Sequence, residues 1–248
     1  MDLNFAILGT SKIASVHLRN LRTLGATAVS LVYSRNQHRA AAFATATSLA
    51  AYTCELDNLL EDDTIDAVLV ATEPERHVDL ARQCMAAGKH VLIEKPLDLD
   101  LTKAKSFADE MAAYDVVVSV ISQLRFDPAL KQMRSLLEHN KGHRPLLATL
   151  TMVRRRDEEY FADGSAWRRT AGSVFLNQGI HWLDVLNWFF GIPVNVQATS
   201  RTTRPFLSCA DQTAAVIDYD DRVSVSLVGS TFGDRNHDDR FTLFSPFD

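Results

Sequence analysis

The chain has 248 residues, of which 46% are apolar and 23% are charged, as in a typical globular protein. These fractions exclude a disordered, collagen-like or coiled-coil chain. Its 26 basic and 31 acidic residues give a net charge of −5, so the overall field does not favour a polyphosphate backbone, and nucleic acid is not an expected partner.

Strand and helix patterns alternate over the first half of the chain. The apolar run 4–8 ends at Gly9, and a helical pattern follows. Further strands are predicted over 27–33, 67–71, 90–93 and 116–121. The helical patterns are formed by Ala14, Leu18 and Leu21, by Val78, Ala81 and Met85, and by Ala104, Phe107, Ala108 and Met111. This alternation predicts an α/β fold with a doubly wound parallel sheet and right-handed crossovers.

The pattern changes past about residue 125, where a helix is followed by segment 141–145. The apolar positions of this helix are Leu130, Met133 and Leu137. We therefore place a domain boundary here and assign residues 1–123 to a first domain and residues 124–248 to a second.

Strands of period two follow, over 194–199 and 223–227, and residues 219–222 are typical of a turn between two of them. Such alternation is typical of antiparallel strands that are covered on one face. The second domain is therefore predicted to be α+β, with a mostly antiparallel open sheet.

The chain begins without a basic leader segment, and no apolar run approaches the roughly 18 residues that span a bilayer. The three cysteines, Cys54, Cys84 and Cys209, are far apart, which argues against a disulfide framework and a CxxC metal site. We expect a cytoplasmic protein that does not enter a membrane.

A glycine turn follows the first predicted strand. Gly9 occupies the first position of the G-x-G-x-x-G dinucleotide fingerprint, Ser11 replaces the second glycine and Ala14 the third. Backbone amides at such a turn face a pyrophosphate. An ordinary turn between strand and helix is the alternative interpretation.

The second strand ends without the acid that an NAD site would place against the ribose hydroxyl. Ser34, Arg35 and Arg39 stand there instead and are suited to a 2′-phosphate, which favours NADP over NAD. Alternatively, this segment is a solvated helix start with Asn36 as its cap.

The strand 90–93 delivers Glu94, Lys95 and Pro96 at its carboxyl end. Ligands of open α/β sheets bind at that edge, and a lysine there can donate to a substrate oxygen. Most lysines are merely solvated, so the placement is what favours a functional role.

A helix predicted to close at residues 190–193 begins near Asn177. Its apolar stripe comprises Trp182, Val185, Leu186 and Phe189. Asn177, His181 and Asp184 recur at i, i+4 and i+7 and are expected on another face of this one helix, where a carboxylate can orient an imidazole. No second histidine or cysteine is spaced to complete a zinc site, so no metal is expected.

The dense charge block 154–159 joins three arginines to three acids. We expect it to be a solvated loop.

With these residues in place, the chain resembles the Gfo/Idh/MocA family of nicotinamide-dependent sugar and polyol oxidoreductases. The resemblance is most specific where the run 87–93 leads into Glu94-Lys95-Pro96 and is paired with the later Gly-Ile-His-x-x-Asp segment, 179–184. It also includes residues 7–14, Ala71-Thr72 with His77, 124–126 and 172–178, and so covers nearly the whole chain.

The resemblance implies an N-terminal Rossmann domain that binds NADP or NAD. Together with the motifs above, it assigns the cofactor to Gly9, Thr10, Ser11, Lys12, Ile13, Ser34, Arg35, Arg39, Thr72, His77, Glu94 and Lys95. Thr72 and His77 are expected to line the cofactor groove.

The resemblance also implies catalytic roles. Lys95 would contact the reacting oxygen beside the nicotinamide, and His181 would exchange the hydroxyl proton. Asn177 would orient the substrate, and Asp184 would support His181. The implied substrate contacts are Arg125, Trp167, Arg168, Asn177 and His181.

Family members usually continue well beyond Asp248, so the second domain is expected to be shortened at its C-terminus. The open sheet often packs against another subunit in this family, which implies a homodimer or homotetramer.

The resulting hypothesis is an NADP-preferring oxidoreductase that transfers hydride to or from a sugar, nucleotide sugar or cyclic polyol. Two alternatives stay open. One is a catalytically silent relative that acts as a dinucleotide-binding sensor or interaction module. The other is a dehydrogenase or reductase of a non-sugar carbonyl or diol.

Overall fold

The computed structural model describes residues 3–25, 27–139, 147–162, 166–219 and 223–244. The chain divides into two units, Met1–Ile121 and Ser122–Asp248. The predicted segment 141–145 and most of the predicted turn 219–222 lie outside the described residues.

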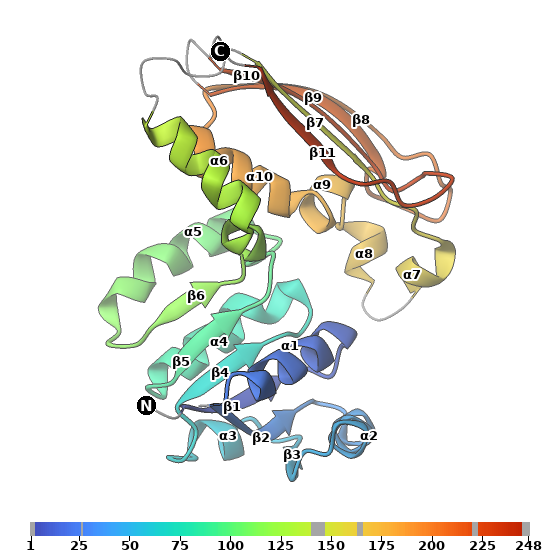
Figure 1. Ribbon diagram of the computed structural model, residues 1–248. Coiled ribbons are helices and arrows are strands. Elements are labelled where there is room, and N and C mark those ends of the chain that lie inside the picture. Colours follow the sequence, from blue (N-terminus) through green and yellow to red (C-terminus); the bar gives the residue numbers. More distant parts are fainter. Residues whose placement is uncertain (1–2, 26, 140–146, 163–165, 220–222, 245–248) are drawn as a thin grey trace. The chain divides into compact units, whose positions relative to one another are not determined.

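Six parallel strands form the sheet of the first unit, in the order β3-β2-β1-β4-β5-β6 (Figure 1). The strands are β1 (Leu3–Leu8), β2 (Thr27–Tyr33), β3 (Ala51–Thr53), β4 (Ala67–Val70), β5 (His90–Ile93) and β6 (Val118–Val120). The helices between them are α1 (Lys12–Thr23), α2 (Gln37–Thr47), α3 (Asp57–Leu60), α4 (His77–Ala86) and α5 (Leu101–Glu110). The predicted doubly wound sheet is therefore confirmed.

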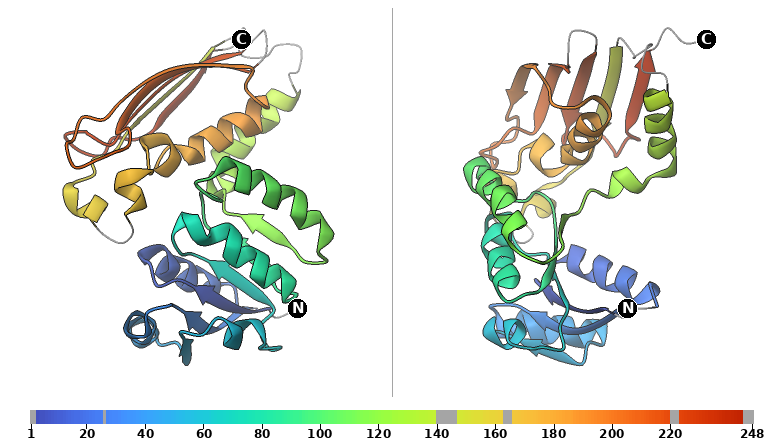
Figure 2. Two further views of the ribbon diagram at one scale, coloured as in Figure 1. Left: turned by 180° about the vertical axis from the view of Figure 1, so that it is seen from behind. Right: turned by 90° about the vertical axis from the view of Figure 1, so that its left-hand side faces the viewer.

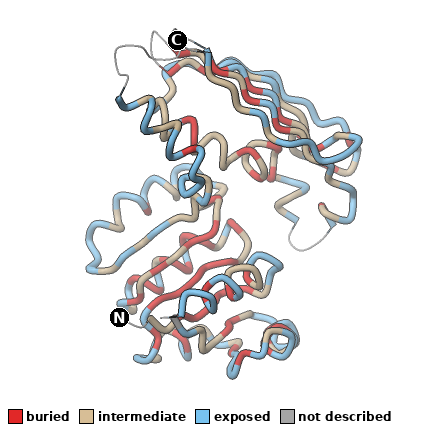
Figure 3. Tube along the Cα trace, viewed as in Figure 1, coloured by how far each residue is buried: buried red, intermediate tan, exposed pale blue. Residues whose placement is uncertain are grey.

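Helices cover both faces of this sheet. Alternate side chains of β1 and β4 pack with α1 and α2 on one face and with α3, α4 and α5 on the other. All four residues of β4 are buried, as its unbroken apolar sequence requires (Figure 3). In α5, however, Phe107 is buried while Ala108 is exposed, so the predicted apolar stripe is narrower than expected.

Five strands form the sheet of the second unit, in the order β11-β7-β10-β9-β8. They are β7 (Leu147–Val153), β8 (Asn195–Arg201), β9 (Gln212–Asp218), β10 (Ser224–Ser230) and β11 (Arg240–Phe244). Only the pair β7 and β10 is parallel, so the predicted mostly antiparallel sheet is confirmed.

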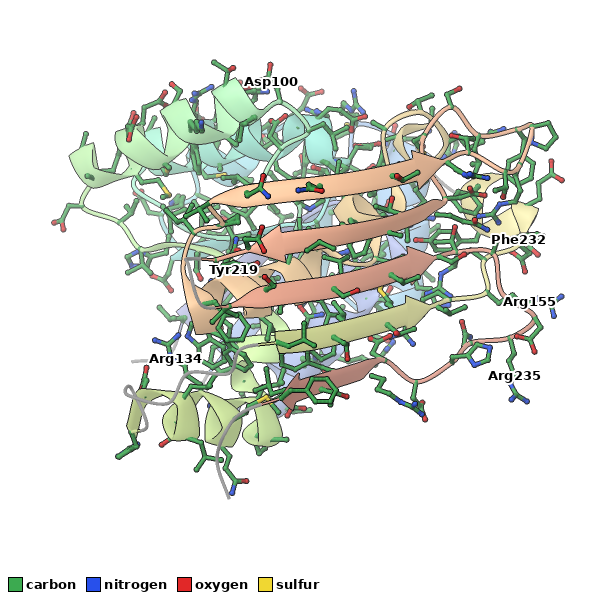
Figure 4. All side chains as sticks on the ribbon, turned by 90° about the horizontal axis from the view of Figure 1, so that it is seen from above. Asp100, Arg134, Arg155, Tyr219, Phe232 and Arg235 are labelled. Atoms are coloured by element: carbon green, nitrogen blue, oxygen red, sulfur yellow. The ribbon has the colours of Figure 1, made fainter. Side chains whose placement is uncertain are left out.

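Helices lie along one face of this second sheet (Figure 2). They are α6 (Pro128–His139), α7 (Glu158–Ala162), α8 (Trp167–Thr170), α9 (Val174–Asn177) and α10 (Ile180–Phe190), preceded by the short 3-10 helix η3 (Gln123–Phe126). Leu186, Trp182 and Phe190 of α10 pack against the inward residues of β7, β9 and β10. Figure 4 looks onto the opposite face, which no described helix of this unit covers.

The single helix predicted from Asn177 onward is interrupted. Asn177 ends α9, and α10 begins only at Ile180. Gly179 lies in the break, where a Cβ would meet the Phe175 ring at 2.3 Å. Asn177 therefore does not share one continuous helix face with His181 and Asp184, and that prediction was wrong.

Candidate functional site

The first unit gathers the predicted cofactor residues at the carboxyl ends of its strands. From β1, the chain adds β2 and β3 on one side of the sheet and then β4, β5 and β6 on the other side, so β1 and β4 are neighbours. Open α/β sheets bind their ligands at this point, where the strand order reverses. Gly9, Thr72 and Lys95 lie just beyond β1, β4 and β5 at this edge.

The turn after β1 requires glycine at position 9. Its φ is +115°, and a Cβ there would lie 2.4 Å from the carbonyl oxygen of Ala71. Ser11 Oγ donates to the same Ala71 oxygen at 3.1 Å and caps α1 by accepting from Ala14 N at 3.3 Å. The Ser11 side chain is thus engaged within the turn, which joins the loop after β1 to the loop after β4.

The start of α1 leaves backbone donors for a ligand. The first described intrahelical bond runs from Ser15 N to Ser11 O, so the N–H groups of Lys12 and Ile13 precede it. Amides at a helix N-terminus favour an anion such as a pyrophosphate. The residues predicted for this contact are therefore chemically suited to it.

The segment after β2 presents two exposed arginines. The Arg35 side chain is 61% exposed and lies 3.8 Å from Glu73 Oε1, a weak contact. Asn36 Oδ1 accepts from Arg39 N at 3.0 Å, which confirms the cap that the alternative interpretation, a solvated helix start, predicted for this segment. Ser34 Oγ accepts from Asn36 N at 3.3 Å.

The carboxylate of Glu94 is buried and bridges two elements. Its Oε1 lies 2.6 Å from His17 Nε2 on α1, and its Oε2 accepts from the backbone N–H of Lys95 at 3.0 Å. Burial raises the pKa of Glu94, but the hydrogen bond and charge of His17 and the charge of Lys95 outweigh it and hold the pKa below the ordinary 4.5. Sequence reasoning missed His17, whose partner is 77 residues away.

The Glu94→Gln substitution (E94Q) is expected to lower the free energy of unfolding by about 1–3 kcal/mol at neutral pH. Because the folded-state pKa of Glu94 is depressed, the stability from its ionised form is present above 4.5 and is lost as the pH falls through the folded value. Urea denaturation near pH 7 and near pH 3.5 should therefore show a larger effect of E94Q at the higher pH.

The control for this comparison is Glu75→Gln, which removes an exposed carboxylate of the same unit. An equal destabilisation by E94Q at both pH values would contradict the assignment.

His77, predicted to line the cofactor groove, is fully buried and so is not exposed to a groove within its unit. Its Nδ1 lies 2.8 Å from Pro96 O and its Nε2 lies 3.1 Å from Thr72 O. Burial lowers the pKa of His77 despite these two carbonyl contacts. The ring therefore joins the loops after β4 and β5 and positions Thr72 and Pro96.

In the second unit, a cavity of about 360 Å³ contains His181 in its wall. The other lining residues are Gln123, Leu124, Arg154, Arg156, Gln178, Trp182, Asn236 and Asp239. Gln123 Nε2 lies 3.4 Å from His181 Nε2, near the start of α10. A histidine in a cavity with several polar side chains is suited to proton transfer with a hydroxylated ligand.

Asp184 lies one helical turn from His181, but its carboxylate is paired with Arg125. Arg125 Nε donates to Asp184 Oδ2 at 2.8 Å, and Nη2 donates to Oδ1 at 2.6 Å. This two-bond ion pair connects η3 to α10. Asp184 therefore has a partner that the sequence analysis had assigned to the substrate.

Asn177 is buried in a network of neutral polar groups. Its Nδ2 donates to Tyr160 Oη at 3.1 Å, and Gln178 Nε2 donates to the same oxygen at 2.8 Å. The guanidinium of Arg168 lies 4.7 Å from the Tyr160 ring centroid, and its Nη1 donates to Tyr160 O. The Trp167 ring packs against Gly172, where an added Cβ would lie 2.9 Å from the ring.

The charge block at 154–159 is the expected solvated segment only in part. Four of its residues are exposed, namely Arg155, Asp157, Glu158 and Glu159, whereas Arg154 and Arg156 are half-buried and line the cavity. Arg154 Nη2 donates to Asp239 Oδ2 at 2.6 Å, and Trp182 Nε1 donates to the same oxygen at 2.8 Å. Arg156 Nη2 donates to Gln178 Oε1 at 2.9 Å. Arg154 and Asp239 are 85 residues apart, so no local pattern reveals their pairing.

Within the described ranges, no helix is long and apolar enough to cross a membrane. The same residues contain no group of three or more His, Cys, Asp and Glu side chains that could hold a metal ion.

Family sequence models match both units. Residues 3–122 match the one described as "Oxidoreductase family, NAD-binding Rossmann fold", and residues 130–245 match "GFO/IDH/MocA C-terminal domain". These two matches confirm the resemblance that the sequence motifs indicated.

Curated relatives are similar over most of this chain but are longer. The rhizopine catabolism protein MocA of Rhizobium meliloti is 32% identical over 59% of this chain and 45% of its own length. Inositol 2-dehydrogenase 2 of Saccharopolyspora erythraea is 29% identical over 82% of this chain and 58% of its own length. The chain thus spans roughly half the length of these relatives.

Solved structures share the fold. The WlbA dehydrogenase from Bordetella pertussis, in complex with NADH and UDP-GlcNAcA, has a TM-score of 0.92 at 22% identity, over 99% of this chain and 72% of that one. An oxidoreductase from Agrobacterium radiobacter, in complex with NAD+, L-tartaric acid and magnesium, has a TM-score of 0.86 at 16% identity, over 98% and 72%.

Proposed function

Because the chain belongs to the Gfo/Idh/MocA oxidoreductase family, we propose that it transfers hydride between a nicotinamide cofactor and a CH–OH or C=O group of a sugar, nucleotide sugar or cyclic polyol. The observation that carries the proposal is the glycine turn at the β1–β4 switch point, in a chain that also retains Lys95 after β5 and His181 in a polar cavity. Relatives named inositol 2-dehydrogenase support the substrate class.

The dinucleotide, when bound, supplies the site that gives or accepts the hydride. The close approach of Gly9 to Ala71 keeps a side chain out of the turn, and the amides of Lys12 and Ile13 are suited to its pyrophosphate. Both features fit a dinucleotide, although Ser11 stands where the fingerprint has glycine.

The chain's own residues would handle the reacting oxygen and its proton. We assign Lys95 to donate to that oxygen, which favours the charge that develops on it. His181 is assigned to take up or release the hydroxyl proton. Asn177, an amide that cannot act as a base, would orient the substrate, and Asp184 would hold α10 through Arg125.

The segment after β2 carries arginines where an NAD site would have an acid, so substitution of these arginines tests the cofactor preference. We propose a preference for NADP, with Arg35 and Arg39 facing the 2′-phosphate and Ser34 donating to it. The double substitution R35Q/R39Q is expected to weaken NADPH binding about 10- to 100-fold, because charge-assisted hydrogen bonds are lost, and to leave NADH binding within about threefold.

Titration of the wild-type chain and the double variant with NADPH and NADH, followed by nicotinamide fluorescence, measures this difference. The double variant R19Q/K105Q removes two exposed cations, from α1 and α5, and serves as the charge-matched control. If both double variants weakened NADPH binding equally, the effect would come from net charge and not from a specific contact. If the wild-type chain bound NADH more tightly than NADPH, the NADP assignment would be wrong.

We also propose that the chain forms a homodimer or homotetramer through the uncovered face of the second sheet. Its outward residues are mostly small or β-branched, and Val216 and Val228 are 44% and 45% exposed there. An uncovered sheet face of this kind favours a self-complementary contact. Sedimentation at several protein concentrations tests it, and a strict monomer would contradict it.

A further inference from the structure

The cavity of the second unit has an excess of positive charge. Two arginines and one aspartate are its fully charged lining residues, which leaves one positive charge uncompensated. Arg154 is the compensated one, because Asp239 accepts from it at 2.6 Å. Arg156 therefore carries the excess.

Every hydrogen bond described for the Arg156 guanidinium goes to a neutral oxygen. Nη1 donates to Arg155 O at 2.9 Å and to Asn236 Oδ1 at 3.2 Å, and Nη2 donates to Gln178 Oε1 at 2.9 Å. These bonds use three of the five N–H groups of the side chain. The buried Nε has no partner among the described residues.

Arg156 is half-buried beside an aromatic ring and a second arginine. Its guanidinium lies 5.0 Å from the Tyr160 ring centroid, and Arg168 lies 4.7 Å from the same ring. Arg204 Nη1 donates to the backbone oxygen of Arg156, but Asp211 compensates the charge of Arg204 by accepting from its Nε at 2.9 Å. A half-buried cation whose described acceptors are all neutral favours an incoming anion.

The remaining walls are suited to hydroxyl groups. Gln123 and His181 present polar side-chain atoms to the cavity, whereas the amide of Gln178 is engaged by Arg156, Tyr160 and Asn177. The cavity, at about 360 Å³, is near the small end of the range for small-molecule sites. A compact polyhydroxylated ligand with one anionic group would match both the charge and the size.

We propose that Arg156 binds an anionic group of the substrate, and that this substrate is a carboxylate-bearing polyhydroxy compound of monosaccharide size, such as a sugar acid. This inference rests on the proposed hydride transfer and specifies its substrate. One N–H of Nη2 has no described acceptor and is suited to a carboxylate oxygen, and the buried Nε is the other N–H without a described partner.

The test compares matched ligands by calorimetric titration in saturating NAD+ or NADP+. The acids are D-glucuronate, D-galacturonate and D-gluconate, and their neutral counterparts are D-glucose, D-galactose and D-glucitol. We expect at least one acid to bind about 10- to 100-fold more tightly than its counterpart, and R156Q to abolish that preference. R156K keeps the positive charge but loses the planar guanidinium, and it should retain part of the preference for the acid.

The control variant is R155Q, which removes the same charge one residue away. Arg155 is exposed and lies at the outer margin of the second unit, near Arg235, in Figure 4. Thermal unfolding of each variant shows whether the fold is kept, and weaker binding of the acid to the wild type at high salt supports the charge argument without any variant.

Several outcomes would overturn the inference: neutral counterparts that bind as tightly as the acids, no binding of any acid, or an unchanged preference in folded R156Q. If D-glucose 6-phosphate binds and the acids do not, the anionic group would be a phosphate and the carboxylate proposal would be wrong.

Failure of the proposed hydride transfer gives a different result. Selective binding of the acids without reduction of NAD+ or NADP+ would support the anion site and contradict the hydride transfer. Reduction with neutral sugars alone would support the hydride transfer and contradict the anion site.

Discussion

The His181→Asn substitution (H181N) is expected to lower kcat about 10²- to 10⁴-fold, the usual contribution of a positioned general acid or base. Asparagine keeps a polar side chain near Gln123, which lies 3.4 Å from the ring, but it cannot exchange a proton. The cofactor residues assigned above belong to the other unit, so NADH affinity should stay within about threefold of wild type.

Steady-state kinetics with the best substrate among the sugar acids and their neutral counterparts named above, together with NADH titration by fluorescence, measures both quantities. The control is H139N, which replaces an exposed histidine at the end of α6. A kcat for H181N within about threefold of wild type would remove His181 from the proton-transfer role.

The Gly9→Ala substitution (G9A) is expected to lower the free energy of unfolding by about 2–4 kcal/mol and to abolish measurable dinucleotide binding. The added Cβ would lie 2.4 Å from Ala71 O and 2.8 Å from Ala71 C, both backbone atoms of a buried loop that cannot easily yield. The positive φ of 115° adds strain.

G88A is the matched control for this prediction. Gly88 also has a positive φ, of 72°, but a Cβ there meets nothing within 4 Å, so G88A isolates the cost of the backbone conformation. Urea denaturation should show G9A to be the less stable variant by at least about 1 kcal/mol. Equal destabilisation would mean that the close approach to Ala71 does not control the turn.

Much of the first unit could be predicted because its signals are local. The strand 90–93 has the predicted bounds, and the helix positions Ala14, Leu18 and Leu21 are buried as expected. Burial on both faces of β4 follows from its unbroken apolar sequence. Asn36 was recognisable as a cap because capping is a property of neighbouring residues.

The cavity of the second unit could not be predicted, since distant segments build it. Asn236 and Asp239 come from a loop about 80 residues beyond the arginines that they contact. The break between α9 and α10 contains Gly179, where a Cβ would meet the Phe175 ring, whereas the spacing of Asn177, His181 and Asp184 suggested one continuous face. A run of charged residues does not show which of its members will be half-buried by tertiary contacts, as Arg154 and Arg156 are.

The most direct test of the proposed hydride transfer is to mix the purified chain with NAD+ or NADP+ and a panel of sugars, polyols and sugar acids, and to follow the absorbance of the reduced nicotinamide. We predict reduction of the cofactor with at least one member of the panel, lost in K95M. A folded chain that reduces neither cofactor with any member of the panel would contradict the proposal.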